Sequence, residues 1–162
     1  MALRNIRVEG DEILTKKTRP VTEFNEKLSA LLDDMFETMY EAGGVGLAGP
    51  QIGILRSIAV VDVGENPIEL INPELLSAKG GDIAVEGCLS VPHVWGEVER
   101  PVHIVVKTQD RNGKWRKLTA DGFEARAFLH EMEHLEGKLF TSRVIRFVDE
   151  SELKRDGSES DE

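Results

Sequence analysis

The chain has 162 residues, a length that fits one domain, because compact domains most often contain about 100–200 residues. Hydrophobic residues make up 40% and charged residues 31% of the sequence, which is typical of a globular protein and excludes a disordered chain. Acidic residues outnumber basic ones by 30 to 20, and the formal net charge is −10. Since phosphate backbones and anionic lipids attract basic proteins, this balance argues against DNA or a membrane as the partner.

The single cysteine, Cys88, cannot form an internal disulfide, which is usual for proteins of reducing compartments. The first ten residues lack the apolar stretch of a signal peptide. No segment reaches the ~20 apolar residues that span a bilayer. We therefore expect a cytoplasmic protein with one catalytic domain over residues 1–150. Residues 151–162 are expected to form an acidic, flexible tail.

The first strong pattern predicts an amphipathic helix that is buried along one side. Its apolar residues recur at the i, i+4, i+7, i+8 spacing of a helical stripe. Gly43 and Gly44 follow and would end the helix. The stripe consists of Phe24, Leu28, Leu31, Leu32, Met35, Phe36 and Met39.

A β-rich region follows this helix. Short segments of apolar and β-branched residues, bounded by turn residues, are typical of strands. The composition of Asp110–Gly113 predicts a tight turn between two strands of a hairpin. The expected strands are Ser57–Val63, Glu69–Asn72, Ile83–Glu86, Val102–Thr108 and Lys114–Thr119.

A second helix is predicted from about Gly122 to Glu136, before Gly137. At roughly 100° per residue, one face has Ala125, Phe128, Met132 and Leu135, and the opposite face has Phe123, Ala127, His130 and His134. A helix with two such faces must lie inside the fold, between the core and an active site. The sequence thus predicts an α+β fold, with small antiparallel sheets around this central helix and the first helix packed outside.

The most specific local motif is His130-Glu131-Met132-Glu133-His134. Two histidines at i and i+4 share one face of a helix and can bind the same metal ion. Glu131 is about 100° round from His130, so it can reach a water at the metal without being a ligand, as a general base requires. The alternative is a surface helix with two histidines, since a pattern with three fixed positions recurs by chance.

A metal site of this kind needs a third protein ligand and an open position for water. Residues 139–162 contain no His or Cys, so the candidate lies upstream, at Cys88. A thiolate binds divalent transition metals well, and the strand-like segment around Cys88 contains a glycine that would let it approach the helix. The alternative is a small buried apolar side chain, which is the commoner role of a lone cysteine.

Residues 43–53 form a glycine-rich segment. Glycines at this density let the main chain approach a ligand or another strand closely. Gln51 near the end of the segment could donate a hydrogen bond to a carbonyl oxygen that gains charge. No Lys-Ser or Lys-Thr follows, which excludes a phosphate-binding loop. The alternative is a flexible turn after the first helix.

Taken together and in this order, the three segments resemble those of the peptide deformylase family. The signatures of that family are a Gly-x-Gly-x-Ala-x-x-Gln loop, a Glu-Gly-Cys-Leu-Ser segment and a His-Glu-x-x-His helix. They match residues 44–51, 86–90 and 130–134, and the resemblance extends from residue 5 to about residue 148. Any one motif could be accidental, but all three in order leave little room for another family.

The resemblance implies a hydrolase that removes the formyl group from the N-terminal formyl-methionine of new polypeptides and releases formate. It implies that Cys88, His130 and His134 bind one divalent metal ion. In the family this ion is usually ferrous iron, although zinc, nickel or cobalt can occupy the site after purification. Glu131 would take a proton from the attacking water and later pass it to the departing amine.

The resemblance also implies how the substrate binds. In the family the peptide lies as an extra strand between the first two motif segments, and Gln51 and the backbone N–H of Leu89 would stabilise the oxyanion. The methionine side chain needs an apolar pocket beside the metal, whose rim Arg126 would cover with its aliphatic stem. The residues expected to bind substrate are Gly44, Val45, Gly46, Ala84, Gly87, Phe123, Arg126 and Ala127.

The chain departs from the common family pattern on the second helix, where Leu129 replaces a frequent Gln and Glu133 a frequent Asp. We predict that Glu133 pairs with Arg100 and helps to fix the helix. The family also implies a transient contact with the ribosome, which some members make through a basic C-terminal helix. This chain ends instead in a net acidic segment.

Two other functions remain open at this point. A zinc endopeptidase uses the same His-Glu-x-x-His helix, but it needs a downstream ligand and a longer chain. A non-catalytic metal-binding or peptide-binding relative would be expected to lose Glu131 or Gln51, and both are present. Release of formate from formyl-methionyl peptides separates both alternatives from a deformylase.

Overall fold

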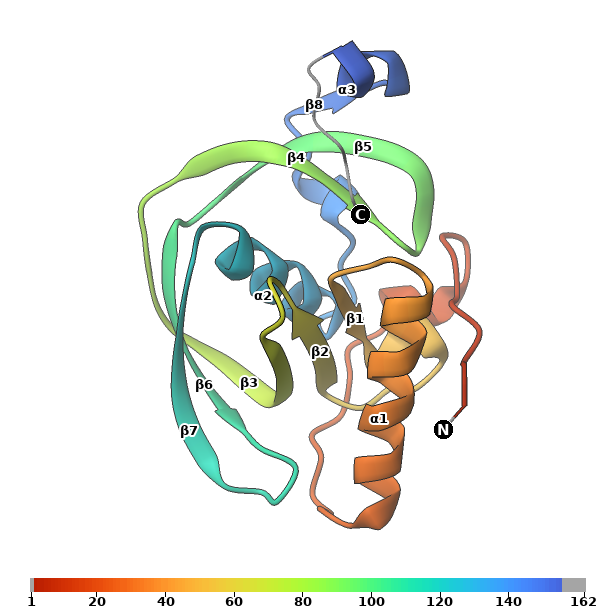
Figure 1. The fold of residues 1–162 in the computed structure, drawn as a ribbon, viewed down its shortest axis with the longest axis vertical. Helices are drawn as coiled ribbons and strands as arrows, with labels where there is room; N and C mark the ends of the chain where they lie inside the picture. Colours follow the sequence, from red (N-terminus) through yellow and green to blue (C-terminus); the bar gives the residue numbers. More distant parts are fainter. Residues whose placement is uncertain (1, 156–162) are drawn as a thin grey trace.

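The computed structural model describes residues 2–155, which form two antiparallel β-sheets and three α-helices (Figure 1). The helices are α1 (Glu26–Glu41), α2 (Gly122–His134) and α3 (Glu150–Arg155). The strands are β1 (Gly46–Ala48), β2 (Ile58–Asp62), β3 (Pro67–Lys79), β4 (Asp82–Cys88), β5 (Val91–Arg100), β6 (His103–Gln109), β7 (Trp115–Asp121) and β8 (Arg146–Val148). This confirms the predicted α+β class. None of the described helices is both long and apolar enough to cross a membrane.

The two sheets are joined by one long, bent pair of strands. The larger sheet has the order β1-β2-β3-β6-β7 and the smaller one β4-β5-β8. Strands β3 and β6 pair in the larger sheet. The chain continues from β3 into β4 and from β5 into β6, so the pair β4 and β5 extends the pair β3 and β6 into the smaller sheet. The bend falls at Gly80, where φ is +80°, a backbone conformation that glycine adopts without strain. This bent pair of strands therefore extends from the core to the segment that carries Cys88.

Strands β1 and β2 lie between α1 and α2, which buries both of their faces. Leu47 and Val60 pack with α1, while Ala48 and Val61 pack with α2. Successive side chains of a strand point to opposite faces, so each strand supplies residues to both clusters. All four of these residues are fully buried. This explains why β2 has an unbroken apolar sequence rather than an alternating one.

The first helix begins two residues after Phe24, the first residue of the predicted stripe, and ends before Gly43 and Gly44 as predicted. The side chain of Asn25 accepts a hydrogen bond from the backbone N–H of Leu28 and caps α1. Gly43, with φ at +75°, follows its end. The predicted stripe faces β1 and β2, and its residues Leu32, Met35 and Met39 are completely buried. Figure 1 shows α1 on the outer side of these two strands, as predicted.

The second helix lies inside the fold. It follows β7 directly, and Ala125 and Phe128 pack into the cluster formed with the larger sheet. On the other side of the helix, His130 and His134 are also buried. The helix ends at His134, two residues earlier than predicted. Figure 1 shows α2 enclosed by the strands, so both of its faces are used.

The end of the described chain differs from the prediction. Residues 151–155, which were expected in a flexible tail, belong to α3. Arg146 of β8 forms a salt bridge with Glu152 of this helix, and Leu153 is buried. The burial of Leu153 and the salt bridge between Arg146 and Glu152 thus hold residues 151–155 in place. The rest of the predicted tail, residues 156–162, lies outside the described residues.

Candidate metal centre

Cys88, at the end of β4, meets two histidines of α2. One ligand atom from each of Cys88, His130 and His134 can be chosen so that all three lie within 4.8 Å of one another. The Sγ atom of Cys88 is 3.4 Å from Nε2 of His134, and the centres of the two imidazole rings are 5.2 Å apart. The spacing of the two histidines along the helix gives them a common face, and the bent pair of strands brings the sulfur of Cys88 to that face.

Hydrogen bonding determines which nitrogen of His130 faces the cluster. Its Nδ1 lies 3.0 Å from a carboxylate oxygen of Glu86, which leaves Nε2 directed toward Cys88. His134 also directs Nε2 at the sulfur, and its buried Nδ1 has no hydrogen-bond partner among residues 2–155. Both imidazoles therefore offer the same type of nitrogen to a shared ion.

The protonation of these groups fits a bound cation. Burial, followed by the charge of His130, holds the pKa of His134 well below its ordinary value, so this ring is neutral, as a metal ligand must be. Burial alone would lower the pKa of His130, but hydrogen bonds to Cys88 and Glu86 raise it well above its ordinary value. The polar groups around His130 that favour a proton on its ring also favour a divalent cation bound there instead of that proton. Two imidazoles and a thiolate form a typical donor set for such an ion.

The carboxylate of Glu131 lies beside the cluster without being part of it. Its side chain is buried, and its Oε1 has no hydrogen-bond partner within the described chain. Burial raises the pKa of Glu131 to about 7. Gly46 of β1 lies directly against this carboxylate, and a Cβ at that position would overlap it. A carboxyl group with this pKa can both accept and release a proton near neutral pH.

The amide of Gln51 is directed at the cluster by its neighbours. The backbone N–H of Ala48 donates to Oε1 of Gln51 at 2.9 Å. The Nε2 group then donates to the hydroxyl of Ser90 at 3.0 Å and lies 3.8 Å from Sγ of Cys88. This pattern fixes the NH₂ end of the amide toward the cluster, where a donor can serve an oxygen that gains charge.

A cleft opens beside these residues. It lies between β1 and β4, which are edge strands of the two sheets. Its walls include Gln51, Leu89, Cys88, His130 and Glu131. The residues predicted to bind substrate that line this cleft are Gly44, Val45, Gly46, Gly87, Phe123, Arg126 and Ala127.

Ala84 is not among the residues that line the cleft, whereas Val85, Glu86 and Gly87, which follow it on β4, are. Ala84 lies on the same face of β4 as Glu86, since alternate residues of a strand share a face. Its predicted contact with the substrate stays a prediction.

Arg126 also lies deeper than expected. The prediction put its stem across the rim of the pocket, but the residue is only 5% exposed. Its guanidinium donates hydrogen bonds to Glu86 at 2.9 Å and to the carbonyl oxygens of Val98 and Asp82 at 2.8 Å. The side chain therefore connects α2 with β4 and β5 from within.

Sequence reasoning missed the central role of Glu86. This carboxylate accepts two hydrogen bonds from Arg100, at 2.7 and 2.9 Å, besides those from Arg126 and His130. Hydrogen bonds from Arg100 and His130 outweigh burial and hold the pKa of Glu86 far below its usual range. The sequence did contain a signal for this role. Glu86 stands two residues before the predicted ligand Cys88, and the helix predicted to be buried carries Arg126, which needs an acidic partner.

The predicted pairing of Glu133 with Arg100 is confirmed. Nη1 of Arg100 donates to Oε1 of Glu133 at 3.0 Å, and Arg143 contacts the other oxygen of the same carboxylate. The charges alternate from Arg143 through Glu133, Arg100 and Glu86 to His130. Outer partners of this kind orient the ligands of a metal site.

A Cys-His-His cluster with a buried carboxyl group of raised pKa beside it, at the base of a cleft between two strand edges, defines a metal-dependent hydrolase. The profile of the polypeptide deformylase family matches residues 3–150. A peptide deformylase of Caldicellulosiruptor bescii is 55% identical over 161 residues, which cover 99% of this chain and 97% of that protein. One of Acetivibrio thermocellus is 52% identical, with 96% and 91% covered.

Solved structures give the same result. The crystal structure of peptide deformylase from Thermotoga maritima has a TM-score of 0.87 and 43% identity, covering 89% of this chain and 99% of that one. The enzyme of Synechococcus elongatus in complex with actinonin has a TM-score of 0.84 and 37% identity, covering 96% and 87%. The chain belongs to the polypeptide deformylase family. It is thus a metal-dependent hydrolase that removes the formyl group from N-terminal formyl-methionine.

Proposed function

We propose that Cys88, His130 and His134 hold one divalent ion and that Glu131 carries the protons of deformylation. The observation that carries this proposal is the convergence of three ligand atoms within 4.8 Å beside a buried carboxyl group. When bound, the ion acts as a Lewis acid that polarises the formyl carbonyl and makes water a stronger nucleophile. Ferrous iron is the proposed ion in the cell, and zinc, nickel or cobalt can replace it in purified protein.

The proposed task of Glu131 is to accept a proton from the attacking water and to donate it to the departing amine. Burial supports this role, because it raises the pKa of Glu131 to about 7 and lets the same group act as base and then as acid. Gln51 and the backbone N–H of Leu89 are proposed to donate hydrogen bonds to the oxygen that gains charge. The orientation of the Gln51 amide by Ala48 and Ser90 supports this assignment.

The substrate backbone is proposed to lie as an added strand between β1 and β4, paired with residues 44–46 and Gly87. The edges of both strands face the cleft, and unpaired strand edges bind extended peptides by main-chain hydrogen bonds. Val45, Ala84, Phe123 and Ala127 are proposed to surround the methionine side chain, beside the stem of Arg126. Val45, Phe123 and Ala127 line the same cleft as the proposed ligands.

Glu131→Gln tests the proton-carrying role. The variant should lose at least about 100-fold in the rate of formate release from formyl-methionyl peptides, while it retains one bound ion per chain. Formate release is measured with formate dehydrogenase, and bound metal by elemental analysis. Unchanged turnover in Glu131→Gln would refute the role, and cleavage of internal peptide bonds by the wild type would instead support a protease.

The identity of the ion is tested on protein prepared without oxygen. Anomalous scattering at the iron edge should give a peak between Sγ of Cys88 and the Nε2 atoms of both histidines. A peak away from these three atoms would contradict the proposed ligands. We also propose that the protein acts in the cytoplasm on nascent chains, with a transient ribosome contact. Failure to sediment with ribosomes at low salt would contradict that contact.

A further inference from the structure

The larger sheet has a second face, directed away from α2. On the inner face, Ile104, Val106 and Ala120 are buried against the helix. The alternate residues of β6 and β7 point outward, and those of β7 are exposed. We define the outer face by the paired rows Gln109–Trp115, Glu74–Lys107–Lys117, Ser77–Val105–Thr119 and Lys79–His103–Asp121.

Two lysines stand directly opposite each other on this outer face. Lys107 of β6 and Lys117 of β7 are cross-strand partners, and like charges at such positions destabilise a sheet. Within residues 2–155, neither lysine forms a salt bridge, and neither do the neighbouring Lys114 and Arg116. Within residues 2–155, the ammonium of Lys107 contacts the ring of Trp115 and has Glu74 of β3 as its other cross-strand neighbour. Lys117, on the edge strand β7, has only Lys107 opposite it in the described part of the chain, so a bound anion would relieve the repulsion between the two lysines.

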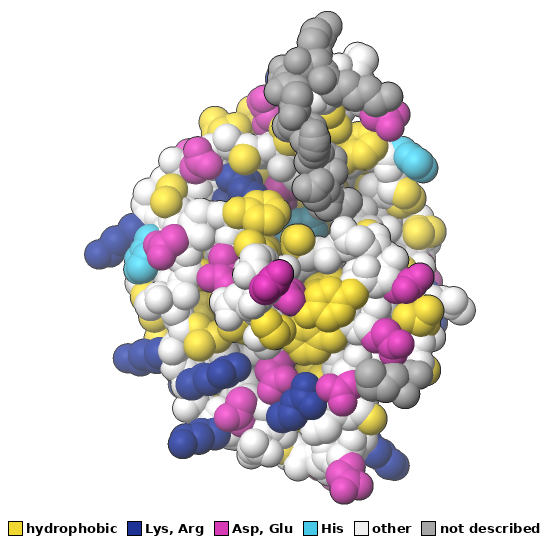
Figure 2. Space-filling model, in the orientation of Figure 1, with side chains coloured by type: hydrophobic (Ala, Val, Ile, Leu, Met, Phe, Trp, Pro, Cys, Tyr) yellow, Lys and Arg dark blue, Asp and Glu magenta, His cyan; other side chains and the backbone are white. Residues whose placement is uncertain are grey.

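The positive charge is concentrated on this hairpin. Residues 103–121 contain five basic and two acidic residues, in a chain with 20 basic and 30 acidic ones. Of the five, only Arg111 is neutralised by salt bridges, to Asp33 and Glu69. Figure 2 shows Lys and Arg side chains gathered on the side of the molecule where Figure 1 draws β6 and β7. The hairpin is thus a basic region on an acidic protein.

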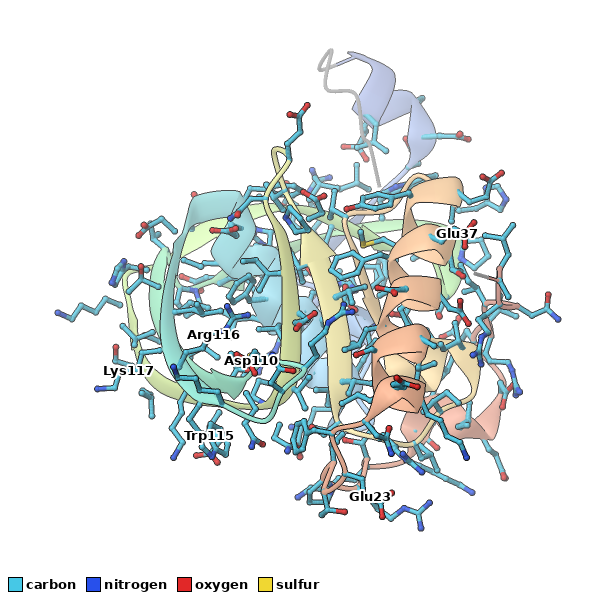
Figure 3. All side chains as sticks on the ribbon, turned by 60° about the horizontal axis from the view of Figure 1, so that its bottom comes forward. Glu23, Glu37, Asp110, Trp115, Arg116 and Lys117 are labelled. Carbon is cyan, nitrogen blue, oxygen red and sulfur yellow. The ribbon has the colours of Figure 1, made fainter. Side chains whose placement is uncertain are left out.

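A tryptophan is exposed within this basic region. Trp115 is 45% exposed, whereas tryptophan is on average more deeply buried. The ammonium of Lys107 lies 4.6 Å from the centre of its ring, which holds the ring in place on one side. Figure 3 shows Trp115 and Lys117 projecting from the hairpin, away from the helices. The ring therefore offers a flat surface to a molecule in solution.

We propose that the outer face around Trp115, Lys107 and Lys117 binds single-stranded RNA. Lysines without a salt bridge attract phosphates, and an exposed ring allows an unstacked base to stack on it, a combination used by proteins that bind single strands. An acidic peptide would satisfy the lysines but would leave the ring without a planar partner. Thr119, in the next row of the face, offers a hydroxyl to the ribose 2′-hydroxyl, which distinguishes RNA from DNA.

Fluorescence anisotropy with a labelled 12-nucleotide oligouridylate tests the proposal on the full, metal-loaded chain. If about three phosphates are contacted, the slope of log K against log salt is about −2, so affinity should fall roughly twenty-fold between 50 and 200 mM salt. Trp115→Ala should weaken binding about five-fold or more, while Trp115→Phe keeps a stacking ring and most of the affinity. Lys107→Glu with Lys117→Glu should abolish binding.

A charge-matched control separates this face from net charge. Lys27 and Lys138 are exposed and lie outside β3, β6 and β7, so replacing both by Glu changes the total charge equally and should leave RNA affinity within two-fold. All variants should release formate at the wild-type rate, because none of these residues lines the cleft. Absence of wild-type binding at 50 mM salt would overturn the proposal. So would equal losses in the control, or binding to oligothymidylate or acidic peptides that is as tight as binding to RNA.

Discussion

The replacement of Glu86 by Gln tests whether the buried charges behind the cluster fix His130. Glu86 accepts hydrogen bonds from Arg100, Arg126 and His130 at 2.7–3.0 Å, and its side chain is 4% exposed. The amide keeps the shape of the carboxylate but removes the buried charge that Arg100 and Arg126 share. Among the described residues, Arg100 then keeps only Glu133, and Arg126 only the exposed carboxylate of Asp82 at 3.8 Å. Removal of one partner from a buried ion pair typically costs about 3–5 kcal/mol.

This cost should appear in two separate measurements. For a domain of this size, the loss of stability corresponds to a melting temperature lower by about 6–20 °C. In addition, His130 loses the acceptor that orients its ring, and loss of such an outer partner typically weakens metal binding about 10–100-fold. Urea unfolding of metal-free protein gives the first quantity, and competition with a chelator gives the second.

Asp33→Asn is the matched control, because it removes a carboxylate from a solvent-exposed pair with Arg111. The two side chains are 45% and 29% exposed, and their charged atoms are 3.1 Å apart. Such a pair contributes at most about 1 kcal/mol, so the control should unfold almost like the wild type and bind metal equally well. If Glu86→Gln costs no more than this control, or leaves metal affinity unchanged, the positioning role of Glu86 is refuted.

Three other substitutions test the base, the pocket and the stability in acid. Gly46→Ala places a Cβ against the carboxylate of Glu131, and formate release should fall about 100-fold with metal content unchanged; turnover within ten-fold of wild type would contradict this packing argument. Phe123→Ala removes a half-exposed wall of the cleft, and steady-state kinetics should show KM raised about ten-fold with kcat nearly constant; an unchanged KM would remove Phe123 from the pocket. A hydrogen bond from the backbone N–H of Ala2 lowers the pKa of Asp34 below its ordinary 3.8. The ionised Asp34 therefore stabilises the folded protein above about pH 4, and this stabilisation is lost as the pH falls through the lower pKa of the folded state. Asp34→Asn should therefore show a shallower loss of unfolding free energy between pH 6 and 3, and parallel curves for the two proteins would show that Asp34 contributes no such term.

The features predicted from the sequence are those whose information is local. The i, i+4 spacing of His130 and His134 gives their common face from helical geometry alone, and the same geometry puts Glu131 beside them. The buried stripe of α1 also follows from its spacing. Cys88 was predicted from the lack of a His or Cys after the helix and from the family motif, because no local rule states which strand approaches a helix. Spacing thus predicted two of the proposed ligands and the proposed base, whereas the third proposed ligand needed the rest of the sequence.

The features missed are those that depend on pairing between distant segments. The sequence of β5 contains Pro92, Gly96 and several charged residues, so it lacks the apolar alternation typical of a strand. It is nevertheless a strand because it pairs with β4 on one side and β8 on the other. Arg100 at its end was predicted to pair with Glu133, but its second contact, with Glu86 of β4, was not predicted because it depends on the pairing of β4 with β5.

The net charge of the chain illustrates the same point. A total of −10 argues against binding of nucleic acid only if the charges are spread evenly, because local fields act over about one Debye length, ~8–10 Å in physiological salt. The pairing of β6 with β7 brings Lys107 and Lys117 to opposite positions, although nine residues lie between them in the chain. Most of the acidic residues lie outside this hairpin, and salt screens those that are distant from it. The charge that a ligand meets is thus set by strand register, which a sum over the sequence does not contain.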